Sequence, residues 1–168
     1  MLSKRNDAPM YLWFKLIHVA AVIVFLGNIS LGVFWKDAAD RTRDPRIMAH
    51  TLRSIIVADR WFTIPSVIVL LAGGIATAIA EHIPILATGW ILWSIILFII
   101  SGIAFGPIAR AQRAMEVAAS EAVKTGALDE ARYKRLSANW NVWGMIALLA
   151  PVVAVCLMVL KPHLPAFH

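Results

Sequence analysis

Long apolar stretches, each free of Lys, Arg, Asp and Glu, alternate with polar segments along this chain. Each stretch has at least about 20 residues, the length that an α-helix needs to cross a hydrocarbon core of roughly 30 Å. In lipid the backbone polar groups must bond within the segment, so each stretch is expected to be a helix. The sequence therefore predicts an all-α fold, a four-helix transmembrane bundle built from Leu16–Trp35, Trp61–Ala80, His82–Ala109 and Leu136–Leu160.

The composition agrees with this prediction and leaves little chain for anything else. Of the 168 residues, 60% are hydrophobic, and the mean hydropathy is +0.74. These values exclude a soluble domain and a disordered chain. We predict a single four-helix integral membrane domain over residues 1–168, with spans at about 10–36, 54–80, 88–109 and 138–160 and with helical extensions in the cytoplasm.

Local signals refine the second helix. Asp44 followed by Pro45 is typical of an N-cap and a first helical position, so this helix is predicted to begin near Pro45. Pro65 should bend it, because proline lacks the N–H that the helical ladder needs. The pair Gly73-Gly74 is expected to let a neighbouring helix pack closely.

The third and fourth helices carry signals of their own. Gly126 is expected to end the third helix, and Leu128–Leu136 to form a short helix that leads into the fourth span. Gly102 and Gly106, four residues apart, form a flat strip on the third helix. We expect this strip to pack within the bundle, or else to contact a second copy or a larger membrane complex.

Basic residues are concentrated on one side of the predicted membrane. Twelve of the 16 Lys and Arg residues lie between the first and second or the third and fourth apolar stretches. The positive-inside rule places both of these loops in the cytoplasm and both termini outside. Tryptophans near both boundaries fit two interfacial belts. The lipid bilayer is the expected partner of the basic loops, and no nucleic-acid partner is predicted. The other side holds Lys4, Arg5, Lys15 and Lys161.

A basic stripe lies at the start of the second helix. Its members fall within about a quarter of the helix circumference. They are expected to reach lipid phosphates or other anions, and a clamp for a propionate or substrate carboxylate is the alternative. The stripe consists of Arg46, His50, Arg53 and Arg60. The adjacent Asp59 is expected to pair with a loop arginine rather than to relay protons.

His18 is the candidate for chemistry, because it is the only ionisable side chain well inside a span apart from the thiol of Cys156. It is either a buried histidine bonded to a hydroxyl or carbonyl, or the ligand of a haem iron. Second ligands are sought near the outer surface, at His82 and His163. Haem propionates would point toward Lys15.

Several short motifs resemble a predicted bacterial integral-membrane family, known as domain of unknown function 2269, over nearly the whole chain. More distantly they are similar to membrane haem-containing protoporphyrinogen oxidases and to copper-resistance D membrane proteins. The motifs are Leu16-Ile17-His18, Arg60, Ile64-Pro65, Gly73-Gly74 and the C-terminal run from Met158 to Pro162. The resemblance implies a multi-pass protein of the bacterial inner membrane and a haem b ligand at His18.

The resemblance has a limit in the third helix. The oxidases carry Trp-Leu-His-x-Lys there, and this chain reads Trp90-Ile91-Leu92-Trp93-Ser94, without the His or the Lys. Neither porphyrinogen oxidation nor the second haem ligand carries over. The predicted function is a small haem b redox protein that exchanges electrons with a quinone, a porphyrin or a partner protein. The alternative is a cofactor-free accessory or assembly subunit of a larger membrane complex.

Overall fold

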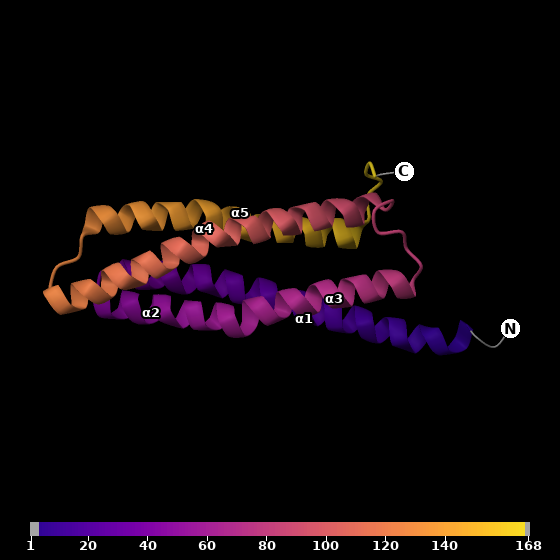
Figure 1. Cartoon of the computed structure of the whole chain (residues 1–168), viewed down its shortest axis with the longest axis horizontal. Coiled ribbons are helices and arrows are strands. Elements are labelled where there is room, and N and C mark those ends of the chain that lie inside the picture. The colour runs from indigo at the N-terminus through magenta and orange to yellow at the C-terminus, as the bar shows by residue number, and fades with distance from the viewer. Residues whose placement is uncertain (1–3, 167–168) are drawn as a thin grey trace.

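The computed structural model describes residues 4–166, with side chains from Met10 onward, as long helices that run back and forth along one axis (Figure 1). No strand is present in this part of the chain, which confirms the predicted all-α class. Four helical stretches are long and apolar enough to cross a membrane. The elements are α1 (Lys4–Thr42), α2 (Pro45–Ala58), η1 (Asp59–Thr63), α3 (Ile64–Ala80), α4 (Gly89–Thr125) and α5 (Glu130–Leu160).

The two ends of the bundle differ in what they hold. We call "basic end" the end with the α1–α2 turn and the α4–α5 loop, and "terminal end" the end where α1 begins, α3 joins α4 and α5 finishes (Figure 1). In each candidate span, at most 33% of the residues of the apolar 18-residue segment are buried within the chain. The remaining apolar surface is what a lipid bilayer would cover.

Side chains cap the helices largely where the sequence indicates. The carboxylate of Asp44 accepts the N–H of Arg46 over 2.8 Å at the start of α2. Gly126 adopts φ 79° after α4, so this helix ends as predicted. The helix predicted over Leu128–Leu136 begins at Glu130, capped by Asp129, and continues without a break through the fourth apolar stretch as α5.

The second candidate span departs from regular α-helix just before Pro65, where it forms a π-helical turn. Pro65 has no N–H to offer the carbonyl of Trp61, four residues earlier. The ladder widens there, and the N–H of Ile64 bonds to the carbonyl of Asp59, five residues back. The wider turn η1 therefore lies directly before Pro65 and sets the position of the Asp59 side chain.

The tightly packed core lies at the basic end. It joins α2, α4 and α5, and its largest fully buried side chains are Leu52 and Met115. Small residues let these helices approach closely. The other members of the core are Met48, Ala49, Ile108, Ala111, Ala118, Ala119, Tyr133 and Trp140.

The terminal end consists of two helix pairs. α1 packs on α3, and α4 packs on α5, but no Cα atom of α3 lies within 8 Å of one in α4 or α5. In Figure 1 the α1–α3 pair and the α4–α5 pair diverge toward this end. Within the second pair, the hydroxyls of Ser94 and Ser101 donate to the carbonyls of Ala154 and Ala147. The helices are thus joined as a bundle mainly at the basic end.

Candidate functional site

His18 lies on α1 where this helix meets α3 in the terminal half. Its Nδ1 is 2.8 Å from the carbonyl oxygen of Leu70. Because a carbonyl can only accept, Nδ1 donates the hydrogen, and in a neutral imidazole this leaves the lone pair on Nε2. A Cβ added at Gly73 would lie 3.2 Å from the Cβ of His18, and one at Gly74 would lie 3.1 Å from its ring. The glycine pair therefore makes the close approach possible, as the sequence predicts.

The other ring nitrogen of His18 is open to its surroundings. No hydrogen bond among the described residues includes Nε2. No buried side-chain nitrogen or oxygen in the described part is without a partner, so Nε2 is accessible rather than enclosed. His18 thus presents one fixed nitrogen to α3 and one free acceptor to what surrounds the helix pair.

The two predicted second haem ligands, His82 and His163, lie beyond the ends of α3 and α5. His82 is exposed beyond α3 with φ 56°, eight residues past Gly74, which is roughly 12 Å along a helix. His163 is exposed in the segment after α5, whose Leu164 carbonyl lies against Gly89. No three His, Cys, Asp or Glu side chains of the described part could share a metal ion. Lys15 donates to the hydroxyl of Tyr11 over 2.8 Å, and both are near the terminal end.

The four residues of the basic stripe have different surroundings. Arg46 and Arg60 are exposed. Arg53 forms an ion pair with Glu116 of α4 over 2.8 Å, which ties α2 to α4. His50 and Arg53 border an open groove whose other walls are Ser54, Val57, Ala58, Trp61 and Phe62. This groove carries basic groups at one end and aromatic rings at the other.

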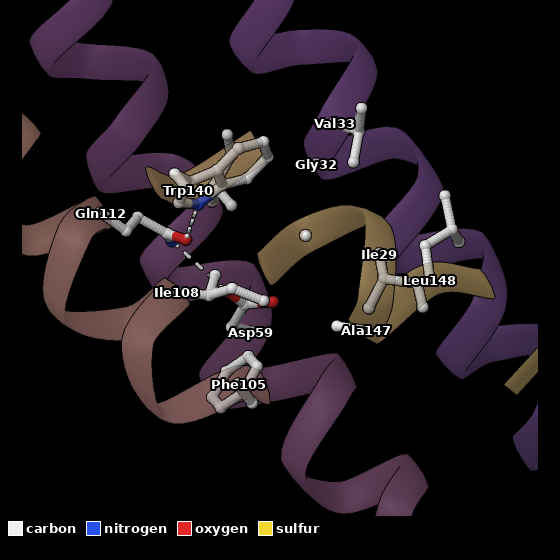
Figure 2. A pocket seen from close by; sticks show the side chains of 12 residues that line it. Ile29, Gly32, Val33, Asp59, Phe105, Ile108, Gln112, Trp140, Ala147 and Leu148 are labelled. Carbon is white, nitrogen blue, oxygen red and sulfur yellow. Dashed lines mark hydrogen bonds between the residues drawn. The ribbon is translucent and has the colours of Figure 1, made fainter. Parts of the chain in front are cut away.

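A second polar site surrounds Asp59, and sequence reasoning missed it. The expected ion pair with a loop arginine is wrong, because no ion pair of the described residues includes Asp59. Its carboxylate accepts from Thr63, Asn28 and Gln112 instead. Figure 2 shows Gln112 between Asp59 and the indole N–H of Trp140, which donates to the Gln112 oxygen over 3.1 Å.

A third polar cluster ties α1 to α5 at the basic end. Lys36 is only 3% exposed and pairs with Asp40 over 2.8 Å. Its ammonium also bonds to Ser137 and lies 5.1 Å from the ring centre of Trp140. Tyr133 donates to Asp40 over 2.6 Å. Trp140 therefore contacts both the Lys36 cluster and the Asp59 site.

A signal for the Asp59 site does exist in the sequence. Asn28 is an amide side chain in the middle of an apolar stretch, and Gln112 is another in a helix rich in alanine. Such groups need partners in the bundle. The missing information is the rotation of each helix, which decides whether the amides meet each other, the backbone or water.

One of three comparisons with known proteins gives a match. Comparison with curated proteins and with solved structures found no match. A family profile described as "Predicted integral membrane protein (DUF2269)" matches residues 12–162, which covers all four candidate spans except Met10 and Tyr11 of the first. The chain therefore belongs to this family of predicted integral membrane proteins.

Proposed function

We propose that this protein is a small haem-binding redox protein of the bacterial inner membrane, in which Nε2 of His18 ligates the iron of haem b. The observation that carries the proposal is the state of the His18 ring. Nδ1 is held by the carbonyl of Leu70, and Nε2 is accessible and unbonded among the described residues. Metal-binding histidines commonly have this form, with the second nitrogen donating to a backbone carbonyl that fixes ring and tautomer.

The apolar environment explains why Nε2 needs a bonding partner. A polar atom without a partner in hydrocarbon costs several kcal/mol, because no water is there to bond to it. Nothing in the described part of α1 or α3 satisfies Nε2. A group from outside the chain is therefore expected to bind Nε2. Neutral imidazole is a good ligand for iron, so a haem iron fits this role.

The residues around His18 fit a haem from one side. His18 would supply one ligand to the iron, and the half-buried Tyr11 and exposed Lys15, up to two helical turns closer to the terminal end, would receive propionates. His82 and His163 are exposed beyond the ends of α3 and α5. When bound, the haem would supply one-electron transfer, with a quinone, a porphyrin or a partner protein as the electron partner.

The charge distribution supports an orientation for this site. The basic end carries twelve of the 16 Lys and Arg residues, so we place it in the cytoplasm and both termini in the periplasm. His18 is then in the periplasmic half of the bilayer. Labelling of a single cysteine at position 41 or 84, in Cys156→Ala protein, tests the orientation, because position 84 should react only from outside.

The absorption spectrum of the purified protein tests the proposal. Protein made with a haem supply, or titrated with haemin in nanodiscs, should show a Soret band that His18→Ala abolishes. His50→Ala is the matched control, since His50 is exposed on α2 at the other end of the bundle. A wild-type protein that is folded, helical and colourless after haemin titration would contradict haem binding.

An accessory subunit of a larger membrane complex is the second candidate, favoured by one observation. Gly102 and Gly106 do not pack within the bundle as expected, since a Cβ added at either would meet no atom within 4 Å. The strip is thus free for a helix of another copy or of a partner, and Nε2 of His18 could accept from that partner. Crosslinking and native mass spectrometry, repeated with Gly102→Leu and Gly106→Leu, test this function. A monomer in mild detergents and in nanodiscs would exclude it.

A further inference from the structure

Asp59 is held by neutral hydrogen-bond donors from three elements. The hydroxyl of Thr63 in η1 donates to Oδ1 over 2.9 Å, and the amide of Asn28 in α1 donates to the same atom over 3.4 Å. The amide of Gln112 in α4 donates to Oδ2 over 3.3 Å (Figure 2). Asn28 also donates to the Thr63 hydroxyl over 2.8 Å. The charge of an ionised Asp59 is therefore stabilised by dipoles and not by a cation.

The charged groups on the elements that pack against Asp59 are used elsewhere or are exposed. Lys36 of α1 pairs with Asp40, and Glu116 of α4 pairs with Arg53 of α2. Trp140 is the residue of α5 that reaches this site, through Gln112, and α3 carries no charged side chain. The remaining charged neighbours along η1 and α4 are the exposed Arg60, Arg110 and Arg113.

The site lies within the predicted second span, 54–80, near its basic-end boundary, and borders a small cavity. Asn28 is seven residues from Trp35 along α1, which is roughly 10 Å of helix. The cavity has a volume of about 50 Å³, which is room for a few water molecules, since one needs on the order of 10–15 Å³. Asp59, Gln112 and Trp140 are its polar walls, and apolar side chains such as Ile29 and Phe105 form the rest (Figure 2).

We propose that Asp59 is a proton-binding site inside the membrane, which the carboxylate fills by taking a proton from hydronium in the cavity and so becomes a carboxylic acid. The low dielectric favours the neutral acid, and the three donors favour the carboxylate. No cation of the described residues is paired with the carboxylate of Asp59, so the site changes its charge by gaining or losing one proton. The inference does not depend on the haem proposal.

The surrounding groups favour a proton over a metal ion. Sodium or another hard cation needs several oxygen ligands at once. Here Asn28, Thr63 and Gln112 direct N–H and O–H groups at the carboxylate, and most of the cavity wall is apolar. The site offers one ionised oxygen pair and no further oxygen cage.

Infrared difference spectroscopy of the full-length protein in nanodiscs tests the proposal. Acidification should produce the carbonyl stretch of a protonated carboxylic acid, and Asp59→Asn should remove this component. Asp37→Asn is the matched control, because Asp37 is an exposed carboxylate paired with Arg41 over 2.7 Å and the Asp59 component should persist. Gln112→Leu removes a donor to the carboxylate, so the midpoint of the band should move to higher pH. This variant keeps the test decisive if Asp59→Asn does not fold.

Three results would overturn the proposal. The first is a wild-type spectrum with no pH-dependent carboxylic-acid band. The second is a band that persists in full in Asp59→Asn, or whose midpoint is unchanged in Gln112→Leu. The third is a carboxylate signal that responds to sodium at fixed pH, which would assign the site to a metal cation.

Discussion

The basic and terminal ends of this bundle use the same kind of helix in different ways. At the basic end, α2, α4 and α5 share a packed core, and polar clusters at Lys36 and Asp59 connect α1 to its neighbours. At the terminal end, α3 has no close backbone approach to α4 or α5, and the free nitrogen of His18 is accessible. The helices of the basic end are joined by contacts within the chain. At the terminal end, the surfaces between the two helix pairs are left to ligands, lipids or partners.

Breaking the Lys36–Asp40 pair should have the largest effect on stability. Lys36 is 3% exposed, so Lys36→Ala leaves the carboxylate of Asp40 and its bonded neighbours without their cation. We expect a loss of about 3–5 kcal/mol in the free energy of unfolding. Steric-trapping or denaturant unfolding measurements in bicelles check this value. The double variant Lys36→Met with Asp40→Asn should recover part of the loss, and equal instability of both variants would contradict the role of the pair.

A cavity-forming substitution in the basic-end core should have the next largest effect on the free energy of unfolding. Leu52→Ala removes a side chain that is 1% exposed in the basic-end core, and a loss of about 2–5 kcal/mol is expected. Ile103→Ala is the matched control, because that side chain is 68% exposed and lipid replaces its contacts. Thermal unfolding of the two variants in the same detergent compares them. Similar losses for both would show that burial in the basic-end core does not determine the cost of these substitutions.

The sequence predicts the elements of both ends better than their contacts. Hydrophobic length gives the four spans, and the Asp44 and Gly126 signals give helix ends, because each depends on a few neighbouring residues. The π-helical turn and the Asp59 site depend on how α1, η1 and α4 are rotated about their axes. Helices that are apolar on all sides carry little information about rotation. The sequence therefore predicted the close helix packing at Gly73-Gly74 correctly but mispredicted the partners of Asp59.

A bulky residue under His18 should perturb the terminal end alone. Gly73→Leu places its side chain where a Cβ already lies 3.2 Å from His18, so α1 and α3 must separate. We expect a cost of about 1–3 kcal/mol and loss of any spectral signal that depends on His18. Gly102→Leu is the control, since a Cβ there meets no atom within 4 Å. A normal spectrum and stability in Gly73→Leu would contradict the packing of this pair.

The exposed ion pair between α2 and α4 should matter least. Arg53 has a side chain that is 69% exposed, so its contact with Glu116 is screened by solvent and salt. Arg53→Ala should cost less than about 1 kcal/mol, and the loss should shrink as salt is added. Unfolding at low and high ionic strength measures both effects. A loss comparable to that of Lys36→Ala would contradict the ranking.

Distance measurements between spin-label pairs test the contrast between the two ends most directly. Labels go at Arg46 and Val117 for the basic end, and at Ile75 and Ile99 for the terminal end, in Cys156→Ala protein in nanodiscs. We predict one narrow distance distribution at the basic end with or without haem. At the terminal end we predict a broad distribution that narrows when haem binds and stays broad in His18→Ala. Narrow distributions at both ends without haem, and no response to it, would contradict the claim that a ligand at His18 completes the terminal end.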